Sequence, residues 1–189
     1  MDAAWISNIA GFDDAPFERD HQGRVSLVGA VYAGLRFDGV LLGDIEKDGA
    51  DGAGQISRLL LDSRFADHVR LIMLQGITLA GFNVVDVFSL ARDTGLPVLV
   101  VCRGRPDMNA VRRALLKAIP DGRKKWAIIE KLGEMEPVNG IYMQRVGLSR
   151  RKAAATIDHF SVHSQIPEPV RTAHLIAGAL ATGQSRGAP

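Results

Sequence analysis

Polar and cationic side chains stand directly after two apolar segments of this chain. Gln75 follows the segment 69–74. Arg103 and Arg105 follow the segment 97–102. Each segment is a short run of mostly aliphatic residues, a pattern typical of strands buried on both faces of a parallel sheet. Functional groups of such sheets lie beyond the carboxyl ends of the strands. An amide and two guanidinium groups at one sheet edge therefore indicate a site where the arginines hold a phosphate.

The elements that position these groups follow from the spacing of apolar residues. Segment 83–94 has helical spacing and ends at Gly95, so with its flanking strands it predicts a βαβ unit. Three earlier β-rich segments predict an antiparallel meander: 5–12, 25–33 and 35–42. Three antiparallel strands followed by a parallel βαβ extension, with helices on both faces, match the ribonuclease H-like α/β fold. In that fold the first strand lies beside the fourth, which makes Asp13 a neighbour of Gln75.

The rest of the chain predicts more helices than strands. Helical spacing occurs at 55–65, 107–119, 148–159 and 170–181, and a short strand is expected at 141–146. Residues 126–132 fit either a strand or a helix, and the glycine-rich acidic stretch 44–54 predicts a loop. No internal repeat or long linker interrupts the sequence, so we expect one domain over residues 1–189.

The composition is that of a soluble globular protein, with 47% hydrophobic residues. No apolar run approaches the ~20 residues of a membrane-spanning helix. The N-terminus lacks the basic start and apolar core of a signal peptide. The one cysteine, Cys102, lies inside an apolar strand and excludes an internal disulfide framework. These features predict a cytoplasmic protein with no membrane association.

The formal net charge of +2 conceals an uneven distribution of charge. Residues 1–68 carry twelve acidic and six basic side chains, whereas residues 69–189 carry nine acidic and seventeen basic ones. This distribution suits an acidic metal site beside a surface that binds a polyanion. Two oppositely charged, solvated faces explain it equally well. The cations that we select as contacts for nucleic acid are Arg105, Arg112, Arg123, Lys124 and Arg171.

Four blocks of the sequence resemble the endonuclease V superfamily, and more closely its relatives known as domain of unknown function ninety-nine. These blocks are IAGFDDAPF, LQGITLAGFNVVDVFSLARDTGLPVLVVCRGRPD, VGLSRRKAA and IPEPVRTAHLIAG. Together they cover most of the chain in the order of the superfamily. The resemblance implies an endonuclease V-like fold and hydrolysis of nucleic acid, with Mg²⁺ or Mn²⁺ as cofactor and DNA or RNA as partner.

The resemblance also implies roles for particular residues. Asp13 matches the first-strand metal ligand, and His174 matches a ligand on the last helix. Arg103 falls where endonuclease V has a lysine after its fifth strand. The superfamily's glutamate motif between strands three and four is not recognisable here. Asp48 and Asp51 are the nearest acidic residues, and we take Asp51 as the third metal ligand.

Gln75 is the main departure from the superfamily, because it occupies the position of the second aspartate. Two divalent ions roughly 3.5–4 Å apart stabilise the attacking and leaving oxygens of phosphodiester hydrolysis. A glutamine offers a carbonyl oxygen without charge, and a missing carboxylate removes an attraction on the order of several kcal/mol at an effective dielectric of ~20. The sequence therefore favours a site for one ion over a site for two.

Two functions from different classes remain open. The first is metal-dependent, endonuclease-like hydrolysis at an altered site, with Asp13, Gln75, Arg103 and His174 as the catalytic set. The second is a nucleic-acid-binding module that has lost catalysis, for which Gln75 is the motivating residue. A third, an interaction subunit whose acidic half meets another protein, follows from the charge distribution alone.

Overall fold

A mixed seven-stranded sheet forms the centre of the computed structural model, which describes residues 5–185. The strand order is β3-β2-β1-β4-β7-β9-β8. β1 (Asn8–Asp14) pairs antiparallel with β2 (Arg24–Ala33), and β2 pairs antiparallel with β3 (Arg36–Glu46). On its other side β1 pairs parallel with β4 (Leu71–Gln75), and β4 pairs parallel with β7 (Val98–Cys102). The predicted meander with a parallel extension is confirmed, including the contact between the first and fourth strands.

Two short strands complete one edge of the sheet. β9 (Ile141–Val146) pairs antiparallel with β7, and β8 (Glu136–Val138) pairs antiparallel with β9. The sequence does not predict β8, because three residues with a central proline show no strand periodicity. After β4, the small strands β5 (Thr78–Leu79) and β6 (Asn83–Val84) form a separate hairpin.

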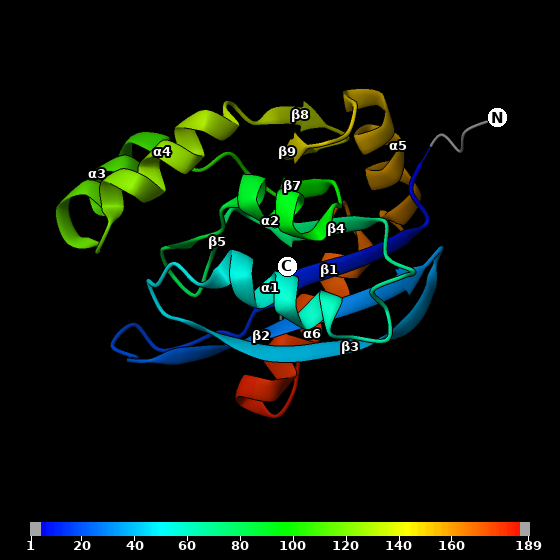
Figure 1. Cartoon of the computed structure of the whole chain (residues 1–189), viewed down its shortest axis with the longest axis horizontal. Coiled ribbons are helices and arrows are strands. Elements are labelled where there is room, and N and C mark those ends of the chain that lie inside the picture. The colour runs from blue at the N-terminus through cyan, green and yellow to red at the C-terminus, as the bar shows by residue number, and fades with distance from the viewer. Residues whose placement is uncertain (1–4, 186–189) are drawn as a thin grey trace.

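Helices cover both faces of the sheet, as Figure 1 shows. α6 (Glu168–Thr182) packs on β1 and β2 from one face. α1 (Gly52–Leu61) packs on β3 from the opposite face, beside α2 (Val87–Thr94). The predicted two-sided arrangement of helices is therefore confirmed.

Three further helices lie toward the β8 edge. α3 (Met108–Ala118) and α4 (Gly122–Leu132) pack against each other, and α5 (Arg150–Phe160) follows β9 (Figure 1). The ambiguous segment 126–132 is therefore helical. Its sequence fits this outcome, since Ile129 is buried while Glu130 and Lys131 are exposed on the other side of the helix.

Several element boundaries differ from those expected, such as those of β1 and α1, and two of the differences have a clear physical cause. β3 extends to Glu46 and takes Asp44 out of the predicted loop, because Arg24 on the paired strand forms an ion pair with Asp44. α2 begins at Val87 and not at residue 83. Its start is set by Asp86, whose carboxylate accepts hydrogen bonds from the first backbone N–H groups of the helix.

The close contact between β1 and α6 positions the candidate site. Gly11 of β1 lies so near Pro169 that an added Cβ would stand 2.4 Å from the proline carbonyl carbon. Only glycine permits this approach. Buried residues surround it, including Ile9 and Phe12, which are both 0% exposed. The last helix is thereby held directly over the strand that carries Asp13.

Among residues 5–185, no helix is both long enough and apolar enough to cross a membrane.

Candidate active site

A carboxylate and an imidazole join the first strand to the last helix. Asp13 of β1 is 6% exposed, and its Oδ2 lies 2.8 Å from Nδ1 of His174 on α6. Burial raises the pKa of Asp13, and the hydrogen bond with His174 opposes this rise. The same hydrogen bond is the main cause of a raised pKa for His174. The hydrogen bond between them therefore favours the charged form of each partner, an imidazolium beside a carboxylate.

Asp14 supplies a second carboxylate at the same strand end. Burial, followed by the negative charge of Asp13, raises the pKa of Asp14 to about 7, and a hydrogen bond from the backbone of Ala80 opposes the rise. Strand alternation predicts that Asp14 faces away from Asp13, so the sequence indicates only a supporting residue. The sequence feature that points to a role for Asp14 is the pair of adjacent aspartates at the end of a strand.

Gln75 ends β4, next to the end of β1. Phe12 pairs with Leu74 in the parallel register, so Asp13 and Gln75 are the next residues along the two strands. The Oε1 atom of Gln75 is buried and has no hydrogen-bond partner among the described residues. Because an unpaired buried acceptor is unfavourable, this oxygen is suited to a ligand at the sheet edge.

Arg103 follows β7, the strand beside β4. Its side chain is exposed, and its positive charge lowers the pKa of His174, which places the two side chains within electrostatic reach. The structure thus brings Asp13, Gln75, Arg103 and His174 to one edge of the sheet.

Asp51 does not join this group. Its Oδ1 accepts hydrogen bonds from the backbone N–H of Glu46 and from Nδ2 of Asn83, and its Oδ2 lies 3.2 Å from the guanidinium of Arg24. Asp48 is also engaged, since its Oδ1 accepts a hydrogen bond from a backbone N–H of the β5–β6 hairpin. The expected ligand set of Asp13, Asp51 and His174 is therefore not assembled. Both loop carboxylates instead hold the chain around α1.

The donors at the sheet edge suit one hard cation. In the described part of the chain, no cluster of three or more His, Cys, Asp or Glu side chains is arranged to hold a metal ion. The oxygen donors that remain are the carboxylates of Asp13 and Asp14 and the unpaired carbonyl of Gln75. Mg²⁺ prefers such oxygen ligands and keeps several waters of its own. Two carboxylates, one of them paired with His174, beside a spare carbonyl fit a single ion, and a second ion lacks ligands.

A basic surface lies next to this edge, on the segment that contains α3 and α4. Residues 103–132 carry nine basic and three acidic side chains. Arg105 and Arg123 are exposed and have no ion-pair partner among residues 5–185. Arg112 is also exposed, and its guanidinium lies over the ring of Trp126. Three of the five predicted contacts for nucleic acid therefore present charge to solvent on one segment.

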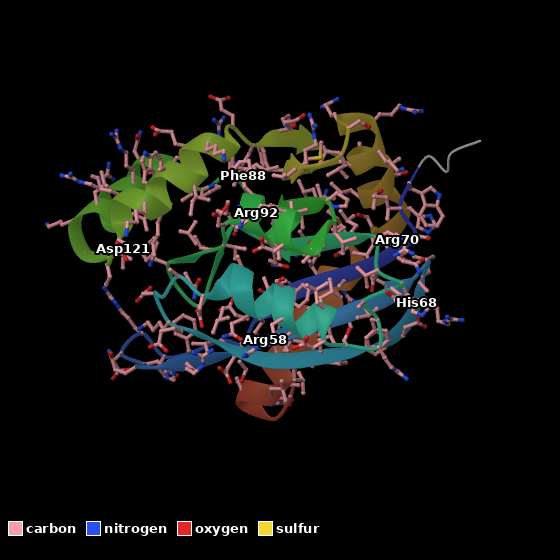
Figure 2. The ribbon with its side chains drawn as sticks, in the orientation of Figure 1. Arg58, His68, Arg70, Phe88, Arg92 and Asp121 are labelled. Atoms are coloured by element: carbon pink, nitrogen blue, oxygen red, sulfur yellow. The ribbon has the colours of Figure 1, made fainter. Side chains whose placement is uncertain are left out.

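The other two predicted contacts have partners of their own. Lys124 lies 2.9 Å from the carboxylate of Asp121, which Figure 2 labels at the turn between α3 and α4. This exposed ion pair leaves Lys124 accessible. Arg171, by contrast, lies 3.2 Å from the buried carboxylate of Glu168 at the start of α6. This ion pair lies within the first turn of α6 and holds the start of the helix.

The sheet order is that of an endonuclease V-like fold. A family model described as endonuclease dU matches residues 6–181 of this chain. The chain belongs to this family.

Comparison with individual proteins agrees with that assignment. The chain is 50% identical to a UPF0215 protein of Deinococcus radiodurans over 182 residues, which cover 96% of this chain and 93% of the relative. A crystal structure of a protein of unknown function from Archaeoglobus fulgidus has a TM-score of 0.85 and 32% identity, and the match covers 93% of this chain and 98% of the other. Endonuclease V of Ciona intestinalis, solved with an inosine-containing DNA, has a TM-score of 0.55 and 10% identity, with 88% and 82% covered. The resemblance to endonuclease V is thus confirmed for the fold.

Proposed function

We propose that this protein hydrolyses phosphodiester bonds of nucleic acid at the edge formed by β1, β4 and β7. The observation that carries the proposal is the Asp13–His174 pair, 2.8 Å apart, beside the half-buried carboxylate of Asp14. Membership of a family named endonuclease dU supports the same reaction. Because dU abbreviates deoxyuridine, a strand that contains deoxyuridine is the first substrate to test.

The pair gives the site a positively charged proton donor. Asp13 holds Nδ1 of His174 and favours the imidazolium. The other ring nitrogen, Nε2, has no hydrogen-bond partner in the described structure, so it is open to a phosphate or to the leaving oxygen. A protonated imidazole at that position stabilises negative charge and supplies a proton to the leaving group. Arg103, exposed at the neighbouring strand end, holds a second phosphate oxygen.

The carboxylates complete the site by holding a cation. Asp13, Asp14 and the Gln75 carbonyl would bind one Mg²⁺ or Mn²⁺, which supplies charge neutralisation at the phosphate and at the attacking water. The raised pKa of Asp14 supports this assignment, since a carboxylate crowded by another carboxylate gains most from a nearby cation. The absence of a charge on Gln75 limits the site to a single ion in our proposal.

A cleavage assay tests this function. The protein is incubated with Mn²⁺ or Mg²⁺ and with labelled DNA that contains one deoxyuridine, one deoxyinosine or neither. We expect cleavage by the natural protein, a loss of at least a hundredfold in Asp13→Asn and His174→Ala, and full activity in the matched controls Asp67→Asn and His68→Ala. Both control residues are exposed and precede β4, whereas Gln75 lies at the opposite end of that strand. Cleavage that survives Asp13→Asn, or no cleavage with either metal, contradicts the proposal.

A binding module without catalysis is the second candidate. The observation in its favour is Gln75, which removes a charge from the position of the superfamily's second aspartate. This alternative predicts salt-dependent binding of nucleic acid that does not change when EDTA is added. Calorimetric titration with Mn²⁺ separates the two, because saturable binding abolished by Asp13→Ala is expected only for the metal-dependent enzyme.

A further inference from the structure

Lys125 of α4 is a buried lysine whose partner is a backbone carbonyl. It is 3% exposed, whereas the two basic residues before it, Arg123 and Lys124, are exposed. Its Nζ donates a hydrogen bond of 2.5 Å to the backbone carbonyl oxygen of Asp48. The carboxylate of Asp121 pairs with Lys124, and no residue in the described part of the chain forms an ion pair with Lys125. Burial of an unpaired ammonium group is unfavourable. The hydrogen bond to Asp48 therefore offsets a cost that a neutral side chain would not incur at this position.

Asp48 and Ala80 are joined in a strained arrangement. Both have left-handed backbone conformations, with φ of 55° and 43°. The backbone N–H of Asp48 donates to the carbonyl oxygen of Ala80 at 2.9 Å, and Oδ1 of Asp48 accepts a hydrogen bond of 2.7 Å from the backbone N–H of Phe82. Residues other than glycine adopt such φ values only at an energetic cost, so the surrounding contacts must hold them there. Lys125 supplies one of these contacts through Asp48.

The turn that contains Ala80 reaches the candidate active site. It connects β5 to β6, shortly after Gln75 in the chain. Ala80 is 0% exposed, and its backbone N–H donates a hydrogen bond to the carboxylate of Asp14. A hairpin whose strands have only two residues each is not stable by itself. The position of the Ala80 N–H therefore depends on the contacts that hold the turn.

Asn83 anchors the second strand of this hairpin and leaves the turn to Asp48. Its Nδ2 donates to the carbonyl oxygen of Glu46 at 2.9 Å, and its Oδ1 accepts a hydrogen bond of 3.1 Å from the backbone N–H of Gly52. These bonds fix β6 against the start of α1, but they do not include Ala80. The conformation of the turn thus relies on Asp48, and Asp48 is held in turn by Lys125.

We propose that Lys125 is a positioning residue of the candidate active site, which acts on Asp14 through Asp48 and Ala80. Its ammonium group holds the carbonyl of Asp48, Asp48 holds the turn, and the turn directs the N–H of Ala80 at the carboxylate that is to bind the cation. Outer contacts of this kind orient metal ligands and raise metal affinity. Because Lys125 lies on α4, the same contact joins the basic segment to the edge that carries the site. This inference rests on the proposed function for the role of Asp14.

Hydrogen exchange of backbone amides tests the first half of the inference without any metal. In the natural protein we expect the amides of Asp48 and Phe82 to exchange on the order of a thousandfold more slowly than in an unstructured peptide, because the turn rarely opens. The amide of Ile72, which donates to Pro97 in the central sheet, reports global unfolding. If Asp48 and Phe82 exchange as fast as unstructured amides, the inference is wrong, and this result does not depend on how any variant folds.

A variant of Lys125 separates local positioning from general stability. Lys125→Met removes the ammonium group and keeps an unbranched side chain of similar length. We expect exchange at Asp48 and Phe82 to become about tenfold faster relative to Ile72, because the turn then opens locally. Lys152→Met removes a lysine from α5 and should leave this ratio unchanged. If Lys125→Met accelerates all three amides equally, or none of them, the inference is overturned.

Calorimetric titration with Mn²⁺ tests the second half. The natural protein and Lys152→Met should bind Mn²⁺ alike, and Lys125→Met should bind it about tenfold more weakly, because Asp14 is no longer held in place. Locally faster exchange with unchanged Mn²⁺ affinity overturns the positioning role and leaves the proposed function intact. A natural protein that binds no Mn²⁺ and cleaves no strand overturns the proposed function, whereas the exchange ratios still decide whether Lys125 holds the turn.

Discussion

Nδ1 of His174 lies 2.8 Å from Oδ2 of Asp13, although 160 residues separate the two along the chain. One hydrogen bond thus ties the end of the central strand β1 to the last helix. It has two consequences for the chemistry. The imidazole is held by Nδ1, which leaves Nε2 without a hydrogen-bond partner among the described residues, and the carboxylate stabilises its charged form.

Replacing this carboxylate should lower the pKa of His174. In Asp13→Asn the main cause of the raised pKa is lost, so the pKa of His174 is expected to fall, because burial and Arg103 both disfavour the charged ring and only Asp14 still favours it. An NMR titration of the imidazole resonances measures the change. An unchanged titration of His174 would show that the hydrogen bond does not exist in solution.

Asp14 should make stability depend on pH. Its pKa is about 7 in the folded protein and 3.8 in a model peptide, so the folded state binds more protons between these values. Stability is therefore expected to fall as pH rises from 4 to 7. Asp14→Asn removes this contribution. The unfolding free energy of the variant, compared with that of the natural protein, should therefore be more favourable at pH 8 than at pH 5 by on the order of 2–3 kcal/mol. Urea unfolding at the two pH values measures the difference.

A matched control separates this effect from a general change in charge. Asp67→Asn removes an exposed carboxylate and should shift stability equally at both pH values. The prediction for Asp14 is contradicted if its variant behaves in the same way.

The sequence was sufficient for six of the seven strands of the sheet, all except β8, and for the edge where the candidate site lies. The alternation and length of apolar runs determine which segments become strands, and chain order places β1 beside β4. The meeting of Asp13 and Gln75 follows from that adjacency. The role of His174 came from the resemblance, because nothing local distinguishes this residue from another histidine on a helix.

What the sequence could not supply depends on contacts between distant segments. Asp51 is drawn away from the site by Asn83 and Arg24, which are 32 and 27 residues distant. Lys125 is buried against the backbone carbonyl of Asp48, which is 77 residues distant. In the sequence alone, that lysine is the last member of a basic run that begins at Arg123.

The contact between Gly11 and Pro169 gives a third prediction. Gly11→Ala places a Cβ 2.4 Å from backbone carbon, and backbone cannot move aside as a flexible side chain can. We expect a loss of stability on the order of 3 kcal/mol and a displaced α6, which also weakens the Asp13–His174 hydrogen bond. Thermal unfolding and the His174 titration measure the two effects. Gly54→Ala is the control, because no atom lies within 4 Å of its added Cβ and the helix should gain about 0.5–1 kcal/mol.

Arg103 and Arg171 provide the last prediction, because both are arginines near His174 with different expected roles. Arg103 is exposed without an ion-pair partner among the described residues, so Arg103→Ala should leave stability nearly unchanged. The Arg103→Ala variant should bind single-stranded nucleic acid more weakly than the natural protein, whatever the base sequence. The slope of log affinity against log salt concentration should decrease by about 1. Arg171 neutralises the buried Glu168, so Arg171→Ala should lower stability by about 3 kcal/mol while the salt slope stays the same. Adding Glu168→Gln to Arg171→Ala should restore part of that loss, since it removes the charge left without a partner. Equal salt slopes for the two single variants would contradict the assignment of Arg103 to phosphate binding.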